Sequence, residues 1–395
     1  MSLPHSQTRG LTLVAFAFAV NMLGTTLPTP LYPLYQRELD ISSPIVTVIF
    51  AVYAVAVIAG LLFFGHQSDR VGRKRTLLAG LALSGVSAIC FIFAHSLIPI
   101  YAGRVLSGIS AGIFTGAGTA AMVDYATGEK RRAITLLAVV VNVGGLGLGT
   151  LLSGLLGQYA AHPLQLPYIV DLALVIAAIG GIFAAPETVT GAHGRMNLSM
   201  QHLRVPEDIR SVFTRAAIVG ACAFAVSGVF SAVAPGFLGV VMNVHSPAIS
   251  GVLVFVLMGA SALGQFVVPR IPQQVAFEIG CSTLVLGMAL LGGTIATHSL
   301  AMIFLSAFAS GIGQGVVMGF GLANINERIS ERRGEVTSAY FVIVYAGLAL
   351  PVVAVGFAAI PLGLSTAGAI FAGIIGFVCL VSAVAGRLRE YAGSR

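Results

Sequence analysis

Long apolar stretches separated by short polar segments recur along the whole chain. A helix needs about 20 apolar residues to cross the hydrocarbon core of a membrane, and twelve stretches meet that length. They predict membrane-spanning helices at about 11–33, 44–65, 76–95, 98–123, 133–158, 166–186, 214–241, 247–269, 274–296, 299–324, 335–360 and 363–386. One longer polar interval separates six of these stretches from the other six. The pattern predicts an all-α membrane protein with two six-helix bundles, at 1–186 and 214–395, joined by a cytoplasmic loop at 187–213.

The composition agrees with lipid as the solvent. Hydrophobic residues make up 57% of the chain and charged residues only 9%, which is too little charge to cover the surface of a water-soluble protein. The 48 glycines allow close approach between membrane helices. The net charge of +7 comes from basic residues in the short loops, where they act as topology signals, so no nucleic-acid partner is expected.

The basic residues also set the orientation. If the N-terminus lies in the cytoplasm, all of the 21 lysines and arginines except Arg37 and Arg104 fall on cytoplasmic segments. The first apolar stretch runs too long for a cleavable signal peptide. We therefore predict a multi-pass protein of the cytoplasmic (cell inner) membrane with both termini in the cytoplasm and the bilayer as its surroundings.

The two halves of the chain resemble one another. The fourth predicted helix reads S-G-I-S-A-G-I-F-T-G-A-G from Ser107, and the tenth reads S-G-I-G-Q-G-V-V-M-G-F-G from Ser310. The first and seventh share A-F-A-V, at Ala17 and Ala223. Parallel repeats of six helices place a solute site near the middle of the membrane, between the halves, where rocking opens it to either side. The repeat predicts a transporter.

The loop after the second predicted helix carries the most specific motif. It reads G-H-Q-S-D-R-V-G-R-K from Gly65 to Lys74. This run resembles the G-x-x-x-D-R-x-G-R-R/K signature of the major facilitator superfamily. Together with the spans and the repeat, the resemblance covers the whole chain and implies that family's twelve-helix fold.

The resemblance implies a gate at the inner membrane surface. Its members would be Gly65, Asp69, Arg70, Gly72, Arg73, Lys74 and Asp124. The two glycines permit a tight turn, Asp69 would face the start of the eleventh helix near Glu335, and Arg73 would pair with Asp124. A plain basic loop that only fixes topology is the alternative.

Two charged residues within predicted spans are candidates for proton coupling. Arg104 stands in R-x-x-x-G-x-x-x-G, which resembles a motif of the family's fourth helix associated with that role; its repeat equivalent is Ala307. Asp171 lies in the sixth helix, and a carboxyl in a low-dielectric site can load and release a proton. The alternatives are an arginine that reaches the headgroups and a carboxylate at the rim of the membrane.

The fifth helix bears on the direction of transport. It reads N-V-G-G-L-G-L-G-T from Asn142 and resembles the glycine-rich motif of antiporters in the superfamily, although the usual Gly-Pro is absent. The resemblance favours export over uptake.

The candidate substrate residues are apolar and aromatic side chains with a few amides and hydroxyls. By the family's architecture they are Asn21, Thr25, Phe114, Asn142, Ser227, Phe230, Gln265, Gln314, Met318 and Tyr345. This set suits a hydrophobic or amphipathic solute that is neutral or cationic. No cofactor or metal is expected, because the four cysteines lie in apolar segments without C-x-x-C spacing. A monomer is expected.

Two transport hypotheses remain. The first is proton-driven efflux of a drug or lipophilic metabolite, and the second is proton-coupled uptake of a small organic nutrient. An enzyme is not expected, because the chain has no His-Glu-x-x-His motif and no paired acids in a span. The P-loop of ATP-driven proteins is also absent. A channel would need neither the repeat nor the gate.

Overall fold

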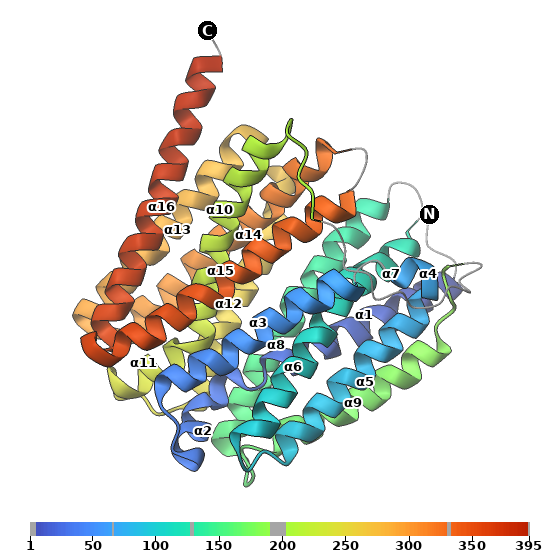
Figure 1. The fold of residues 1–395 in the computed structure, drawn as a ribbon, viewed down its shortest axis with the longest axis horizontal. Coiled ribbons are helices and arrows are strands. Elements are labelled where there is room, and N and C mark those ends of the chain that lie inside the picture. Colours follow the sequence, from blue (N-terminus) through green and yellow to red (C-terminus); the bar gives the residue numbers. More distant parts are fainter. Residues whose placement is uncertain (1–4, 65–66, 127–129, 190–202, 330–332, 394–395) are drawn as a thin grey trace. The chain divides into compact units, whose positions relative to one another are not determined.

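The computed structural model describes residues 5–64, 67–126, 130–189, 203–329 and 333–393. In these ranges the chain is helical throughout its regular structure and contains no strand (Figure 1). Twelve helical segments are long and apolar enough to cross a membrane, by length and composition. The predicted all-α membrane class with twelve spans is therefore confirmed.

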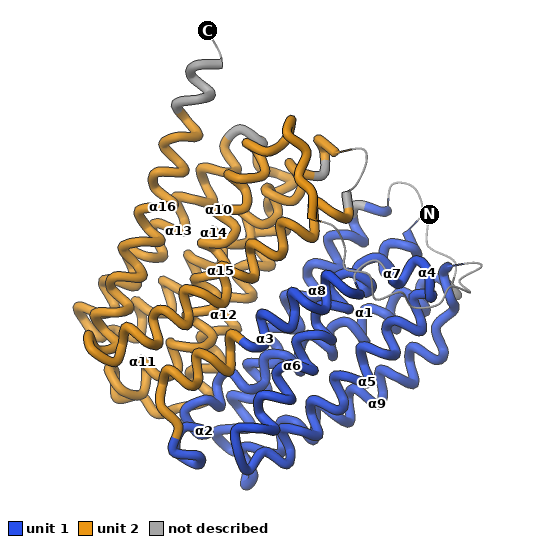
Figure 2. Tube along the Cα trace, viewed as in Figure 1, with its two compact units in different colours: residues 1–40, 52–202 blue, residues 41–51, 203–395 orange. Residues whose placement is uncertain are grey.

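The chain divides into two compact units (Figure 2). Unit 1 comprises residues 1–40 and 52–202, and unit 2 comprises residues 41–51 and 203–395, so that the first turns of α3 are grouped with unit 2. The elements that begin before residue 203 are α1 (His5–Thr26), η1 (Thr29–Leu31), α2 (Tyr32–Leu39), α3 (Ser43–Phe64), α4 (Ser68–Val71), α5 (Arg73–Ile92), α6 (Leu97–Ile113), the π-helical segment η2 (Phe114–Gly118), α7 (Thr119–Asp124), α8 (Lys130–Tyr159) and α9 (Leu166–Ala184). The later elements are α10 (Arg210–Ala232), α11 (Ala234–Val240), α12 (Pro247–Val267), η3 (Val268–Arg270), α13 (Gln273–Thr297), α14 (Leu300–Glu327), α15 (Arg333–Leu362) and α16 (Leu364–Gly393).

The first helix begins and ends earlier than the sequence pattern predicted. The apolar pattern gave one span at 11–33, whereas α1 ends at Thr26 and is followed by η1 and α2. Pro28, Pro30 and Pro33 explain the break, because proline lacks the backbone N–H that a helix needs and disfavours helical geometry in the residue before it. The span predicted at 214–241 is likewise interrupted, between α10 and α11 next to Pro235.

The repeated glycines are packing positions in both units. A Cβ atom on Gly108 or Gly112 of α6 would lie 2.5 Å or 2.6 Å from backbone carbonyl oxygens of α3. In unit 2, a Cβ on Gly311 or Gly315 of α14 would meet backbone carbonyl oxygens of α12. Since only glycine leaves room at these four positions, the repeat records close helix contacts. Arg104, which has no charged counterpart in the repeat, is not required by this packing.

The glycine-rich run of α8 provides the first testable prediction. A Cβ on Gly145 would lie 2.7 Å from the carbonyl oxygen of Ala19 in α1, whereas nothing lies within 4 Å of a Cβ on the adjacent Gly144. Because the Ala19 backbone cannot rotate away, Gly145→Ala is expected to lower stability by about 1–3 kcal/mol. Gly144→Ala should leave stability unchanged or raise it slightly. Thermal unfolding of the purified variants in detergent compares them, and equal effects would contradict the packing described for α8.

Candidate functional site

Arg73 lies at the centre of an ion-pair network at one end of unit 1. Its guanidinium contacts Asp69 Oδ1 of α4 at 2.6 Å and Asp124 Oδ2 at the end of α7 at 2.9 Å. It also donates a hydrogen bond of 2.5 Å to the hydroxyl of Ser68. The Arg73 side chain is only 12% exposed. Its positive charge is therefore largely shielded from water and is balanced by the two carboxylates. The pairing of Arg73 with Asp124 that the sequence predicted is present.

Gly72 joins α4 to α5 with a backbone conformation that suits glycine. Its φ is +105° and its ψ is +145°, a region that residues with a Cβ rarely adopt. Gly72 is also the residue that precedes α5, so that helix begins without a side chain that could cap its first N–H groups. The signature glycine therefore makes the turn and leaves the start of α5 in need of an acceptor from elsewhere.

Glu187 supplies that acceptor. Its carboxylate accepts hydrogen bonds from the backbone N–H groups of Arg73 and Lys74, each at 3.1 Å. A carboxylate at this end of a helix also interacts favourably with the helix dipole. The Lys74 ammonium donates to the carbonyl oxygen of Phe183 at 2.6 Å, near the end of α9. The residues that follow α9 thus cap α5. The sequence analysis placed Glu187 in the central loop and missed this role.

Asp124 and Tyr125 extend the network. The hydroxyl of Thr188 donates to Asp124 Oδ2 at 3.0 Å, and the Tyr125 hydroxyl donates to the carbonyl oxygen of Pro186 at 2.8 Å. Burial, and then the nearby charges of Glu187 and Asp124, raise the pKa of Tyr125 to about 12. Tyr125 therefore keeps its proton and remains a hydrogen-bond donor at neutral pH.

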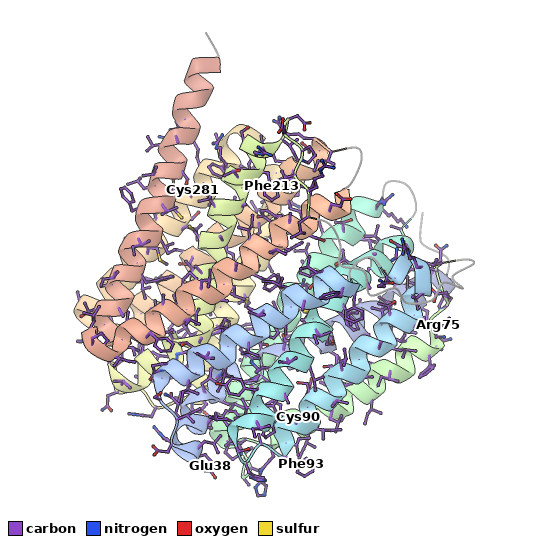
Figure 3. All side chains as sticks on the ribbon, viewed as in Figure 1. Glu38, Arg75, Cys90, Phe93, Phe213 and Cys281 are labelled. Carbon is purple, nitrogen blue, oxygen red and sulfur yellow. The ribbon has the colours of Figure 1, made fainter. Side chains whose placement is uncertain are left out.

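The remaining signature residues take different places. Gly65 lies outside the described residues. Arg70 is an exposed residue of α4. Lys74 donates to a carbonyl oxygen near the end of α9, as described above. Arg75 lies at the same end of α5 as this network, whereas Cys90 lies at the other end of that helix (Figure 3).

Replacing Glu187 by glutamine provides a second prediction. The amide keeps one acceptor oxygen but loses the negative charge at the start of α5, so we expect a loss of about 1 kcal/mol of stability. Glu207→Gln is the matched control, because that carboxylate is highly exposed and its only ion pair in the described structure is a contact of 3.9 Å with Arg210. Thermal unfolding at low and high salt measures both. An unchanged unfolding temperature for Glu187→Gln at low salt would argue against the cap.

Arg104 is buried in unit 1 and reaches the end of α1. Its side chain belongs to α6, the residue is 1% exposed, and it donates to the carbonyl oxygen of Thr25 at 2.7 Å and to the Tyr32 hydroxyl at 2.7 Å. Thr25 lies in the last turn of α1, where backbone carbonyls have no partner within the helix and the dipole favours a positive charge. The guanidinium therefore caps α1. The guanidinium is thus enclosed by protein.

Aromatic side chains surround the Arg104 guanidinium. The ring of Tyr53 lies 4.9 Å from the guanidinium carbon, a distance at which a cation is attracted to an aromatic face. Tyr35 and Tyr168 share a hydrogen bond of 3.2 Å between their hydroxyls, and Tyr168 stacks on Phe91 with ring centroids 4.7 Å apart. Sequence reasoning singled out none of these tyrosines, because they come from three separate helices, α2, α3 and α9.

Asp171 of α9 is buried at 2% exposure and packs against α1. A Cβ atom on Gly24 would lie 2.8 Å from its Oδ2, and its Oδ1 has no hydrogen-bond partner among the described residues. Asp171 forms no ion pair within the part of the chain that the structure describes. The Asp171 side chain is therefore enclosed by protein. An isolated carboxylate is costly to bury, so a proton or a cation must accompany it.

Four predicted substrate residues belong to unit 1. Asn21 is fully buried and its Oδ1 accepts from Ser110 at 2.5 Å, while its Nδ2 has no partner among the described residues. Thr25 is buried and donates to its own helix. Phe114 is buried in η2, 5.9 Å from Phe18 between ring centroids. Asn142 is half-buried on α8. The full burial of Thr25 and Phe114 indicates packing within the unit.

The other six predicted substrate residues belong to unit 2. Ser227 and Phe230 of α10 are buried, as is Gln314 of α14, whose Oε1 has no partner among the described residues. Gln265 and Met318 are half-buried, and Met318 accepts from the Tyr340 hydroxyl at 3.4 Å.

Tyr345 is half-buried in an aromatic group that the sequence analysis missed. Its ring packs edge-on against Phe224, with centroids 5.6 Å apart, and lies 6.4 Å from Phe341. This group is formed by α10 and α15 and offers a larger aromatic surface than Tyr345 alone. No cluster of three or more His, Cys, Asp or Glu in the described ranges is arranged to hold a metal ion.

Comparisons with known proteins agree on one family. A family model described as the Major Facilitator Superfamily matches residues 14–350. The chain is similar to Multidrug resistance protein 2 of Bacillus subtilis (strain 168), 26% identical over 176 residues that make up 43% of this chain and 42% of that protein. It is similar to the Bacillibactin exporter of the same organism, 31% identical over 152 residues, 35% of this chain and 37% of the exporter.

A third relative is the Tetracycline resistance protein, class H, of Pasteurella multocida, 29% identical over 159 residues and 39% of each chain. The chain spans about two fifths of the length of the curated relatives that it matches. The family model, in contrast, covers most of the chain and extends from the first candidate membrane span into the eleventh. The chain therefore belongs to the major facilitator superfamily, a family of membrane transporters.

Proposed function

We propose that this protein exports a hydrophobic or amphipathic drug or metabolite by alternating access, driven by protons that move in the opposite direction. The named relatives support export, because one is a multidrug resistance protein, one an exporter and one a tetracycline resistance protein. The glycine-rich run of α8 supports it as well, through its resemblance to the motif of antiporters in the superfamily.

The observation that carries proton coupling is the burial of Asp171. This carboxyl lies inside a span, is 2% exposed and forms no ion pair in the described ranges. A carboxyl in such a place binds and releases a proton, or neutralises a cationic solute, as part of each cycle. Arg104 has a different part, because it is fixed by the end of α1 and by Tyr32. We propose that Arg104 holds the helices around the coupling site in register and that Asp171 carries the proton.

The network around Arg73 is proposed to be the inner gate. Its ion pairs with Asp69 and Asp124 are short, and Glu187 ties the start of α5 to the end of α9. The Asp69 side chain of this network is 66% exposed. Gly65, Arg70, Gly72 and Lys74 are proposed to shape the same surface.

The solute class follows from the half-buried side chains. Asn142, Gln265, Met318 and Tyr345 combine amides, a thioether and an aromatic ring, and Phe224 and Phe341 enlarge the apolar surface. These groups favour a largely apolar solute, flat or flexible, that carries a few hydrogen-bonding atoms. Phosphorylated sugars and polyanions would need several cationic side chains.

The proposed topology keeps both termini in the cytoplasm of the cell and the protein in its inner membrane. It rests on the lysines and arginines, which lie in or next to the loops on one side of the twelve spans except for Arg37 and Arg104. The proposed working unit is a monomer with the solute, protons and surrounding lipid as partners.

Transport by the purified protein in proteoliposomes tests the proposal. An imposed pH gradient is combined with a set of lipophilic cations, neutral aromatic compounds and small organic acids, and liposomes without protein are the control. Accumulation of a lipophilic compound against the proton flux is expected. Movement of a solute together with protons would instead establish uptake symport, and solute movement that ignores the gradient would reject proton coupling.

A further inference from the structure

The exposed residues of α5 and of the position that follows it form one stripe. They recur at intervals of three or four, so they share one face of the helix. They are Arg75, Ala79, Ala82, Val86, Ile89 and Phe93. Arg75 and Phe93 mark the two ends of the stripe (Figure 3). Since α5 is a candidate membrane span, this apolar face is suited to contact with lipid, and the transport proposal does not use it.

A groove of about 320 Å³ lies along the first half of the stripe. It is lined by Phe64 at the end of α3, by Ile113 of α6 and by residues of α5 between Thr76 and Val86. Two polar residues also line it, Gln67 before α4 and Thr76 in the first turn of α5, and both are buried. The groove is therefore apolar along α5 and polar at the end where that helix begins. All of its lining belongs to unit 1.

The length of the groove matches one acyl chain. From Arg75 to Val86 the helix rises about 16 Å, which is half of the hydrocarbon core of about 30 Å. Ala79 and Ala82 line the groove between these ends, and their small side chains let a hydrocarbon chain lie close to the helix. An empty space here would lose dispersion contacts, and water in it would lack polar partners. Lipid hydrocarbon is therefore the expected filling.

A positive charge at the end of the groove distinguishes between lipids. Arg75 is exposed and forms no ion pair in the part of the chain that the structure describes. The other two basic residues that begin α5 are engaged: Arg73 pairs with Asp69 and Asp124, and the Lys74 ammonium donates to backbone carbonyls at the end of α9. Arg75 is thus the basic residue of α5 that is available to an anion at the depth of the headgroups.

We propose that this groove binds one anionic phospholipid of the surrounding membrane. One acyl chain lies along Ala79 and Ala82, and the phosphate of the headgroup pairs with the Arg75 guanidinium. The lipid belongs to the leaflet that meets the start of α5. A zwitterionic phospholipid also fills the groove, but the amine of its own headgroup balances its phosphate. One basic residue near the membrane surface should therefore favour the anionic lipid by about fivefold.

The test places one fluorescent reporter beside the groove. The chain contains no tryptophan, so Val86→Trp introduces a single reporter at the deep end of the groove. The full-length variant is reconstituted in phosphatidylcholine vesicles with increasing fractions of phosphatidylglycerol whose acyl chains carry bromine, which quenches tryptophan fluorescence on contact. Ile176→Trp on α9 is the matched reporter, because it also replaces an exposed aliphatic residue of unit 1.

The two reporters should respond differently to the anionic lipid. Half of the maximal quenching of Val86→Trp is expected at an about fivefold lower fraction of brominated phosphatidylglycerol than for Ile176→Trp. Brominated phosphatidylcholine should quench both reporters alike. Ile89→Trp, one turn further along the stripe, takes the place of Val86→Trp if that variant does not fold, as judged by its size-exclusion profile.

Two further substitutions in the Val86→Trp protein separate the charge from the groove. Arg75→Gln should remove the preference for phosphatidylglycerol, whereas Arg204→Gln, at an exposed arginine before α10, should retain it. Ala82→Phe should obstruct the groove and remove the preference although Arg75 is still present. Ala177→Phe, at an exposed alanine of α9, should not.

Three results would overturn the proposal. Equal quenching of the Val86→Trp and Ile176→Trp reporters by brominated phosphatidylglycerol would show that the groove has no preference. A preference that survives Arg75→Gln or Ala82→Phe would place the anionic lipid elsewhere. Light scattering that found a dimer dissociated by Ala82→Phe would assign the groove to a second copy of the chain. None of these measurements involves transport, so their outcome is independent of the proposed export.

Discussion

Asp171→Asn is expected to fold normally and to lose the component of transport that an imposed pH gradient drives. Asparagine has nearly the shape of aspartate, so its contact with α1 at Gly24 is retained. It carries no charge, so the cost of burying a carboxylate disappears and stability should be equal or higher. It has no proton to exchange, so gradient-driven transport should fall to the level of liposomes without protein.

The controls for Asp171 separate coupling from folding. Counterflow of solute in the absence of a pH gradient should persist in Asp171→Asn, because that exchange needs no net proton movement. Asp171→Glu keeps the titrating group but lengthens the side chain in a tightly packed place, and it should retain part of the coupling. Wild-type rate and pH dependence in Asp171→Asn would refute the role of Asp171 as the proton carrier.

Arg104→Gln is expected to destabilise the protein by about 2–4 kcal/mol and to abolish transport. The estimate combines the loss of a cation at the end of α1 with the loss of charge-assisted hydrogen bonds to Thr25 and Tyr32. Arg104→Lys should rescue little, because one ammonium group cannot reproduce the planar fork that reaches both acceptors.

Tyr32→Phe provides the matched control for Arg104. It removes one of these two acceptors but leaves the positive charge and the bond to Thr25, so a loss of about 1–2 kcal/mol with partial transport is expected. Thermal unfolding and proteoliposome transport are measured on the same preparations. A stable, transport-competent Arg104→Gln protein would show that α1 needs no cap.

Much of the fold could be predicted from the sequence because lipid imposes simple rules. The apolar runs gave twelve spans, and their ends fall within a few residues of the observed helices except where prolines interrupt α1 and α10. The ion pair between Arg73 and Asp124 could be predicted because Arg73 belongs to the signature motif and Asp124 stands at the end of a predicted helix. Burial of Arg104 and Asp171 could not be predicted, because facing cannot be read from a helix that is apolar on all sides.

The residues that the sequence analysis missed act through distant neighbours. Glu187 looks like an ordinary loop acid, and only the absence of a capping side chain before α5 hints that an external acceptor is needed. Tyr35 and Tyr168 are 133 positions apart, and their contact depends on the packing of α2 against α9. Such contacts arise from tertiary structure and leave no local pattern.

The anchoring of Glu187 has a practical consequence for the segment that connects the halves. Glu187 is held by a hydrogen bond to α5 and Thr188 by one to α7, and the backbone N–H of Val189 donates to Glu187, so these residues behave as a part of unit 1. A protease site or reporter tag inserted between Phe183 and Val189 would therefore disturb the signature turn itself. The same insertion next to Leu203 would leave those bonds intact, so tags belong at the Leu203 end of the interval.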